Sequence, residues 1–494
     1  MKVLVANRNE IAVRIIRTCQ EMGLRTVAVY TEPDQESMHV WLADEAVCIG
    51  PAQAYLDADA VIQAAIQSGA DAIHPGYGFL SENAAFAQKV EEAGLVFIGP
   101  RSETIALLGD KLSSRKAAEQ ASLPVLPGSN GPLPREIPLE MMDNVTFPVL
   151  VKATAGGGGR GIRLATSREE LPDVIAAARK EAKAAFGDDT VYLESLVQDA
   201  RHIEVQILGD GQGKVLCLGD RECSIQRRRQ KLIEEAPAPG LSKRLRKDLC
   251  EAAVRLGSLL HYRSLGTVEF LVTQEEEFFF IEVNPRIQVE HPVSEAVLGL
   301  DLVKQQLLLA AGHPLTLTQK DIVVKGAAIE ARILAEDSAQ NFMPSTGVIS
   351  YVREPGGPGI RVDSALYQGM EVSANYDSLI AKVIASGEDR ASALARLQRA
   401  LTEFAVSGIA TDVEFILQII QSDSFQKAKV TTTYLDSFAP TPASFADGMR
   451  EALAIAAALY KHQRLNAPKT HIPLPAYNNK WQQAAWRDQM RGIG

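Results

Sequence analysis

The chain has 494 residues, which favours about three domains of roughly 150 residues each. Lys and Arg number 51 against 61 Asp and Glu, and this net charge of −10 disfavours a protein that binds nucleic acid over its whole surface. No apolar run approaches the roughly 18 residues of a membrane span, and the five cysteines lack a C-x-x-C pair, so we expect a soluble, cytoplasmic protein with reduced thiols.

The first hundred residues alternate between strand and helix patterns. The periodicity predicts strands over 2–6, 26–30, 70–73 and 95–98 and helices over 11–22 and 83–93. The turn after the first strand reads Asn7-Arg8-Asn9-Glu10 instead of G-x-G-x-x-G, which disfavours a nicotinamide or flavin enzyme. We therefore expect one α/β domain over residues 1–110.

A run of four glycines, residues 156–159, lies in the next region. The predicted strands around it span 149–153, 191–194 and 203–208. Unhindered backbone N–H groups in such a run can surround phosphate oxygens, and Lys152 and Arg160 flank it. No G-x-x-x-x-G-K-[ST] motif is present, so the run is not a P-loop. It indicates a phosphate-binding loop in a mobile subdomain, with a flexible linker as the alternative.

Four cations occupy the five positions from Arg227 to Lys231, although the chain is acidic overall. Such a cluster is suited to an anionic substrate. The alternative is a solvated face that Glu234 and Glu235 already balance.

Two predicted strands, over 266–272 and 277–283, carry acidic side chains. Glu269 lies in the first strand, and alternation places Glu282 and Asn284 on one face at the second. A buried carboxylate needs a cationic partner, because burying it alone is costly. These oxygen ligands suit Mg²⁺ or Mn²⁺ bridging nucleotide phosphates, with a structural salt bridge as the alternative.

Arg286 and Glu290 follow directly, four residues apart. Arg286 is suited to hold an oxyanion while Glu290 removes a proton, although an isolated Arg-x₃-Glu is more often a surface pair. A glycine run, a cation cluster, metal carboxylates and an acid/base pair together are the parts of phosphoryl transfer without a P-loop. Their co-occurrence points to an ATP-dependent ligase.

At these residues the chain resembles the biotin carboxylase component of biotin-dependent carboxylases, within the ATP-grasp superfamily. The resemblance runs from Val3 to about Phe438. The stretches that carry it are Ala6–Arg8, Ala43–Ala46, His74–Asn83, Gly109–Lys111, the glycine run, Glu234–Pro239 and Arg286–Pro292.

The resemblance implies an α/β (α+β) architecture in three domains and a tail. The N-terminal, Rossmann-like domain would span 1–110, and the ATP-grasp domain 111–312, with a mobile lid over about 125–200. A β-rich C-terminal biotin carboxylase domain would span 313–440. Residues 441–494 weakly resemble the segment that follows the catalytic domain in acyl-CoA carboxylase α chains, and our hypothesis is that Trp481 and Trp486 help to dock a partner there. The alternative is that these tryptophans cover the protein's own surface or are disordered.

The resemblance also implies which residues bind each substrate. ATP would contact Lys111, Lys152, Gly158, Gly159, Glu194, Ser195, Leu196, Val197, His202 and Arg229. Two Mg²⁺ or Mn²⁺ ions would be held by Glu269, Glu282 and Asn284. Bicarbonate would be bound by Lys231, Arg286, Gln288 and the Val289 N–H.

In the implied reaction, Glu290 removes the bicarbonate proton and the anion attacks the γ-phosphate of ATP, forming carboxyphosphate. Arg332 would stabilise the enolate-like oxygen of biotin, and Tyr77 would belong to the biotin pocket. The only Met-Lys pair is Met1-Lys2, so biotin would be attached to a separate carrier protein.

The implied partners are a biotin carboxyl carrier protein and a carboxyltransferase subunit, around a homodimer of this chain. The acceptor would be acetyl-CoA, propionyl-CoA or a related acyl-CoA. A biotin carboxylase subunit of a pyruvate or 2-oxoglutarate carboxylase, another ATP-grasp ligase, and a catalytically silent assembly or regulatory subunit are the alternatives.

Three positions depart from the family pattern. Asn9 stands where Gly is usual, Ala155 shortens the glycine run by one, and Arg229 occupies a position that is often His. Because a permanent cation cannot act as a neutral imidazole, Arg229 changes the chemistry near the nucleotide.

Overall fold

The structure is a computed structural model that describes residues 1–129, 131–135, 145–154, 161–441 and 448–466. The chain divides into two compact units, Met1–Ala439 and Pro440–Gly494, which are described separately. Among the described residues, no helix is long and apolar enough to cross a membrane. The predictions for Ala155, Gly158, Gly159, Arg160, Trp481 and Trp486 lie outside the described residues.

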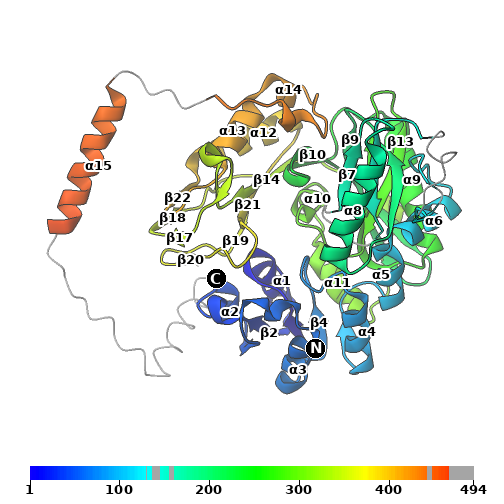
Figure 1. The fold of residues 1–494 in the computed structure, drawn as a ribbon. Helices are drawn as coiled ribbons and strands as arrows, with labels where there is room; N and C mark the ends of the chain where they lie inside the picture. The colour runs from blue at the N-terminus through cyan, green and yellow to red at the C-terminus, as the bar shows by residue number, and fades with distance from the viewer. Residues whose placement is uncertain (130, 136–144, 155–160, 442–447, 467–494) are drawn as a thin grey trace. The chain divides into compact units, whose positions relative to one another are not determined.

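The N-terminal region, blue in Figure 1, contains a parallel sheet. Its five strands follow the order β3-β2-β1-β4-β5. The strands are β1 (Lys2–Val5), β2 (Arg25–Tyr30), β3 (Glu45–Cys48), β4 (Ala72–His74) and β5 (Val96–Phe97), and the helices are α1 (Asn9–Glu21), α2 (Met38–Leu42), α3 (Ala58–Ser68) and α4 (Ala84–Glu92). Val3 packs with α1 and Leu4 with α3 and α4, so helices cover both faces of β1. The predicted strand–helix alternation is confirmed.

The carboxyl ends of β1 and β4 bring two loops together. The Asn7 amide donates to the carbonyl oxygens of Pro75 and Tyr77, each at 2.7 Å. Gly76 has φ +64°, and a Cβ there would lie 2.8 Å from Asn7 Nδ2, so a side chain would collide. The close approach holds Tyr77 beside the cavity described below.

The centre is an antiparallel sheet of eight strands in the order β13-β12-β9-β10-β11-β14-β21-β19 (Figure 1). The strands are β9 (Arg201–Asp210), β10 (Val215–Arg227), β11 (Gln230–Ala236), β12 (Arg263–Val272), β13 (Phe278–Asn284), β14 (Ala327–Leu334), β19 (Ile360–Ser364) and β21 (Leu379–Gly387). The helices packed on this sheet are α5 (Ser102–Gly109), α6 (Lys111–Gln120), α9 (Lys243–Leu259), α10 (His291–Leu298) and α11 (Leu302–Ala310). The β11–β14 pairing joins segments about 100 residues apart, and it decides the geometry of the site.

A smaller sheet, β7-β6-β8, stands apart from the central one with its own apolar core. It comprises β6 (Val149–Ala153), β7 (Ile162–Ala165) and β8 (Val191–Ser195), covered by α8 (Leu171–Phe186). This sheet falls within the predicted lid, whose mobility stays a prediction.

Short strands and helices complete the first unit. The strands are β15 (Glu336–Asp337), β16 (Met343–Pro344), β17 (Gly347–Val348), β18 (Tyr351–Arg353), β20 (Glu371–Val372) and β22 (Ala405–Ser407), and the helices are α12 (Arg390–Glu403), α13 (Val413–Gln421) and α14 (Asp423–Gln426). Helices α12 and α13 pack on β14 and β21 in one apolar core. In the second unit, the structure describes helix α15 (Met449–Asn466), whose residues 451–462 are all exposed.

Candidate active site

A cavity of about 730 Å³ receives side chains from the central sheet, the smaller sheet and the N-terminal loops. The predicted site residues that line it are Tyr77, Lys111, Lys152, Leu196, Val197, His202, Arg229, Lys231, Glu269, Glu282, Asn284, Arg286, Gln288, Val289 and Arg332. Glu194 and Glu290 lie behind the wall as partners of lining cations. Ser195, at the end of β8, is not one of the described lining residues.

The cation cluster forms the tight turn between β10 and β11. Arg228 and Arg229 make the turn with φ of +50° and +66°, the conformation of a two-residue hairpin loop. Arg227 pairs with Glu336, whereas Lys231 points into the site. Arg228 and Arg229 are exposed, so the cluster is spread over several environments and is solvated in part. The adjacent Glu234 and Glu235 do not balance it, because each binds another arginine.

Those two glutamates bind other arginines. Glu234 accepts from Arg332 Nε at 2.6 Å, and Glu235 accepts two hydrogen bonds from Arg390, at 2.6 and 2.9 Å. Each carboxylate thus joins β11 to a segment far along the sequence.

Lys231 is the centre of the charged network. Its Nζ contacts the carboxylates of Glu204, Glu269 and Glu290, the last two at 3.0 and 2.8 Å. Burial lowers the pKa of Lys231, but the charges of Glu269 and Glu290 outweigh this effect and raise it. Lys231 is therefore a permanent cation at the floor of the cavity.

Glu290 is fully buried between two cations. One carboxylate oxygen lies 2.8 Å from Lys231 Nζ and the other 2.8 Å from Arg332 Nη2. Burial raises the pKa of Glu290, but Lys231 and then Arg332 lower it, and the pKa is held well below its usual range. Glu290 is thus an ionised carboxylate whose two oxygens are each held by a cation that lines the cavity.

Arg286 does not pair with Glu290, as an isolated Arg-x₃-Glu surface pair would. Its Nε lies 2.9 Å from Glu82, and its two terminal nitrogens donate to Asn284 Oδ1 and Gln288 Oε1, each at 3.1 Å. The Arg286 guanidinium therefore lines the cavity and is held by Glu82, Asn284 and Gln288, independently of Glu290.

The predicted metal ligands lie on adjacent strands. Asn284 Nδ2 donates to Glu269 at 2.8 Å, and Glu282 lines the cavity beside them. Burial raises the pKa of Glu282, and the charge of Glu269 adds to the shift, while Lys111 opposes it. Two carboxylates that repel each other are a donor set that fits a divalent cation.

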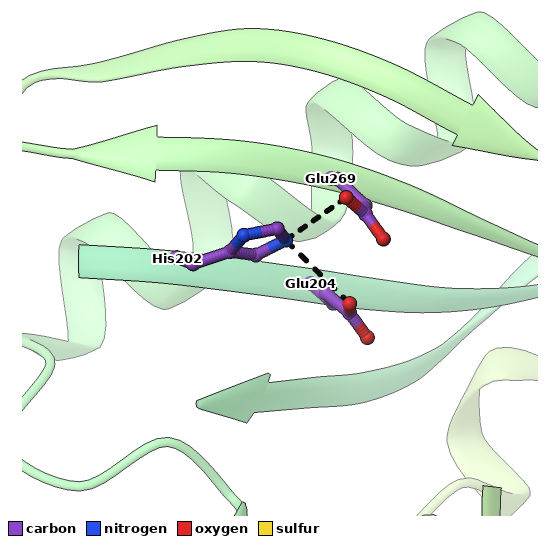
Figure 2. Close-up of side chains that lie close together, drawn as sticks. All are labelled: His202, Glu204 and Glu269. Carbon is purple, nitrogen blue, oxygen red and sulfur yellow. Dashed lines mark ion pairs between the residues drawn. The ribbon is translucent and has the colours of Figure 1, made fainter. Parts of the chain in front are cut away.

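Figure 2 shows a second group of side chains around Glu269 that could hold a metal ion, in which His202 and Glu204 project from β9 toward Glu269. His202 Nε2 lies 2.9 Å from Glu269 and 3.6 Å from Glu204. Glu204 was missed in the sequence, yet the pattern His202-x-Glu204-x-Gln206 on one strand places all three on one face. Glu204 is fully buried and also pairs with Arg221 at 2.9 Å.

Most of the other predicted nucleotide contacts line the same cavity. Lys152 on β6 pairs with Glu194 on β8, and Lys111 begins α6 behind its N-cap Asp110. Burial lowers the pKa of Lys111. Lys111 and Lys152 therefore line the same cavity as the predicted metal ligands Glu269 and Glu282, so a bound polyanion could contact these lysines and a metal ion together.

The backbone conformation and contacts of Asn9 account for its presence where the family usually has Gly. Its φ is +58°, in the region where Gly is free and Asn is tolerated. Its amide donates to the Leu379 carbonyl at 2.8 Å, a contact that glycine could not make.

Three family models match the chain in succession. They are described as the biotin carboxylase N-terminal domain (residues 1–105), the carbamoyl-phosphate synthase L chain ATP-binding domain (110–318) and the biotin carboxylase C-terminal domain (330–437). The biotin carboxylase of Pseudomonas aeruginosa is 50% identical over 440 residues, covering 88% of this chain and 98% of the relative. Relatives named pyruvate carboxylase match the same share of this chain.

Solved structures agree. A biotin carboxylase complex from Campylobacter jejuni, described with β-γ-ATP, has a TM-score of 0.86 at 42% identity, covering 88% of this chain and 98% of that one. The biotin carboxylase domain dimer of Hydrogenobacter thermophilus 2-oxoglutarate carboxylase, solved with MgADP, ADP and bicarbonate, has a TM-score of 0.85 at 44% identity. It covers 88% of this chain and 97% of that chain.

Proposed function

Because the chain belongs to the biotin carboxylase family, we propose that it uses ATP and bicarbonate to carboxylate biotin held on a separate carrier protein. The chain is an ATP-dependent ligase of mixed α/β fold, with N-terminal, ATP-grasp and C-terminal biotin carboxylase domains. The observation that carries the proposal is the buried Glu290 behind the cavity wall, held between Lys231 and Arg332, two cations that line a cavity also presenting Lys111, Lys152 and the acidic ligands.

The first step follows from the charges around Glu290. Bicarbonate would bind to Lys231, Arg286, Gln288 and the Val289 N–H. Glu290 takes the bicarbonate proton, and the resulting oxygen nucleophile attacks the γ-phosphorus of ATP, releasing ADP and forming carboxyphosphate. A bound anion shares Lys231 with Glu290, which weakens the stabilisation of the carboxylate and makes it a better base.

ATP would lie toward Lys111, Lys152, His202, Arg229, the residues 194–197 and the glycines Gly158 and Gly159. Glu269, Glu282 and Asn284 would hold two Mg²⁺ or Mn²⁺ ions, whose chemistry is to neutralise charge on the phosphates. Carboxyphosphate reacts with water, so closure of the lid over 125–200 would both exclude solvent and complete the phosphate contacts.

In the second step, carboxyphosphate breaks down to CO₂ and phosphate. The phosphate takes the proton of the biotin ureido nitrogen, and that nitrogen then attacks CO₂. Arg332 would stabilise the negative oxygen of the deprotonated biotin. Tyr77 would border the biotin pocket, because it lines the same cavity.

We expect ATP cleavage by the purified chain to require bicarbonate, and to be slow until free biotin is added. The reason is that attack on ATP needs the bicarbonate nucleophile, and turnover needs an acceptor for CO₂. ADP release with each substrate omitted in turn is the measurement. Fast ATP cleavage without either substrate would contradict the proposal.

The cytoplasm is the proposed location, where all five cysteines, free in this structure, stay reduced. A homodimer, a biotin carboxyl carrier protein and a carboxyltransferase are the proposed partners, with residues 441–494 as a docking segment. The proposed acceptor is an acyl-CoA, acetyl-CoA or propionyl-CoA. A pyruvate or 2-oxoglutarate acceptor is the alternative, which product analysis with the partner carboxyltransferase decides. The charged cavity argues against a silent subunit.

Replacing Arg286 by Ala is expected to raise the KM for bicarbonate about ten- to a hundredfold while the affinity for ATP persists. Each charge-assisted hydrogen bond lost is worth about 1.5–3 kcal/mol. Steady-state kinetics with bicarbonate varied and a nucleotide-binding titration are the measurements. Glu82→Gln is the matched control, since it removes the ion pair and keeps the guanidinium. Lost ATP affinity with normal bicarbonate kinetics would contradict the assignment.

A further inference from the structure

Lys382 is a buried lysine outside the motifs discussed so far. It lies on β21 and its side chain has no exposed area. Its Nζ donates to the carbonyl oxygen of Val289 at 2.8 Å and lies 3.2 Å from Glu10 and 3.8 Å from Asp363. Burial lowers the pKa of Lys382, but these carboxylates and Glu330 raise it, so the group stays charged.

The Val289 carbonyl belongs to the peptide unit that leads into Glu290. Neighbouring carbonyls of this loop have other partners: Asn284 O accepts from the Arg286 N–H at 2.9 Å, and His291 Nδ1 lies 2.8 Å from Gln288 O. Lys382 therefore reaches the peptide unit from which the side chain of Glu290 begins. A rotation of this peptide plane would move the Glu290 carboxylate relative to Lys231 and Arg332.

The other contacts of Lys382 tie it to the opposite wall. Glu10 is in the first turn of α1 and is almost completely buried. Its second carboxylate oxygen accepts a hydrogen bond from the Tyr77 hydroxyl. The Val289 loop is thus connected through Lys382 and Glu10 to the Tyr77 side of the cavity.

Burying Lys382 at this position costs folding free energy, which indicates that the lysine has a function there. It is directly opposite Arg332 in the β14–β21 register. Like charges directly opposite each other on adjacent strands are destabilising, and an apolar residue would fill a buried position at lower cost. Each cation has its own carboxylates: Glu234 and Glu290 for Arg332, and Glu10 and Asp363 for Lys382.

We propose that Lys382 is a positioning residue for bicarbonate activation: it fixes the Val289–Glu290 peptide. Through the Cα atoms at the two ends of this peptide, it orients the Val289 N–H of the preceding peptide and the Glu290 side chain so that both meet one bicarbonate. This inference rests on the proposed function. Lys382 touches neither ATP nor biotin in this scheme, so its removal should affect bicarbonate use selectively.

The test is Lys382→Met, together with the double variant Lys382→Met/Glu10→Gln. The double variant removes one positive and one negative charge and so leaves the net charge of the buried site unchanged, because Met alone leaves the Glu10 carboxylate without its cation. For both variants we expect the KM for bicarbonate to rise at least tenfold and kcat for biotin-dependent ATP cleavage to fall at least tenfold. The KM for ATP should stay within about twofold of the wild-type value. A purely structural role would lower the melting temperature without separating the two KM values.

Arg246→Met is the matched control, because Arg246 also pairs with a buried carboxylate, Asp220, and donates to a carbonyl, that of Ala238 at 2.9 Å. It lies outside the residues of the catalytic cavity and should leave both KM values unchanged. A folded double variant with wild-type bicarbonate kinetics would overturn the proposed role of Lys382 but would leave the proposed function intact. A wild-type chain without bicarbonate-dependent ATP cleavage overturns the proposed function, and with it this inference.

Discussion

Replacing Glu290 by Gln is expected to lower bicarbonate-dependent ATP cleavage about 10²–10⁴-fold, the contribution of a positioned general base. The amide cannot accept the bicarbonate proton, although it has nearly the shape of the carboxylate that Lys231 and Arg332 hold. ADP release at saturating ATP, bicarbonate and biotin is the measurement. A titration with ATP should show near-normal affinity, because Glu290 lies behind the cavity wall and is not one of the predicted nucleotide contacts.

Glu295→Gln is the control for this variant. Glu295 is also buried and ion-paired, but its partners Arg14 and Arg361 do not line the cavity, whereas Lys231 and Arg332 do. We expect it to affect stability more than turnover. If Glu290→Gln keeps more than about a tenth of the wild-type rate, a different group accepts the proton.

Removing Arg332 is expected to uncouple the two half-reactions. Carboxybiotin formation should fall about 10²–10³-fold, as when one donor to a developing oxyanion is lost. ATP cleavage should fall less, so the ratio of carboxybiotin to ADP decreases. Both products are measured in the same reaction with free biotin.

The variant needs a compensating change because Glu234 is fully buried and Arg332 donates to it at 2.6 Å. Leaving that carboxylate without its arginine is expected to cost about 3–5 kcal/mol of stability. We therefore expect Arg332→Met/Glu234→Gln to fold, with Glu234→Gln alone as its control. An unchanged carboxybiotin-to-ADP ratio in the double variant would remove Arg332 from the biotin step.

Most of the local structure followed from the sequence. Residues 149–153 were predicted as a strand and are β6, and the strands predicted over 203–208 and 266–272 each extend by only a few residues. Period-two alternation also placed Glu282 and Asn284 on one face, and both line the cavity. These features depend on side-chain patterns within a few residues, which the order of the amino acids states directly.

The partners of the charged residues did not follow in this way. Glu234 was taken as a counter-charge for the adjacent cation cluster, but it binds Arg332, 98 residues away. Glu290 was considered with Arg286 four residues earlier, but it meets Lys231 and Arg332. Ion pairs in a sheet form between residues on neighbouring strands. The strand order therefore determines the partners, and the spacing along the chain does not.

The elements, the family resemblance and the types of residue available for chemistry with ATP and bicarbonate follow from the order of the amino acids. The contacts of Lys231 with three carboxylates and of Lys382 with the Val289 carbonyl depend on how the strands pair. The physical reason is the β11–β14–β21 pairing, which places cations from three distant segments around one buried carboxylate and its loop. Which of these strands pair depends on contacts between segments far apart in the sequence, so the pairing is not stated by the pattern within any one of them.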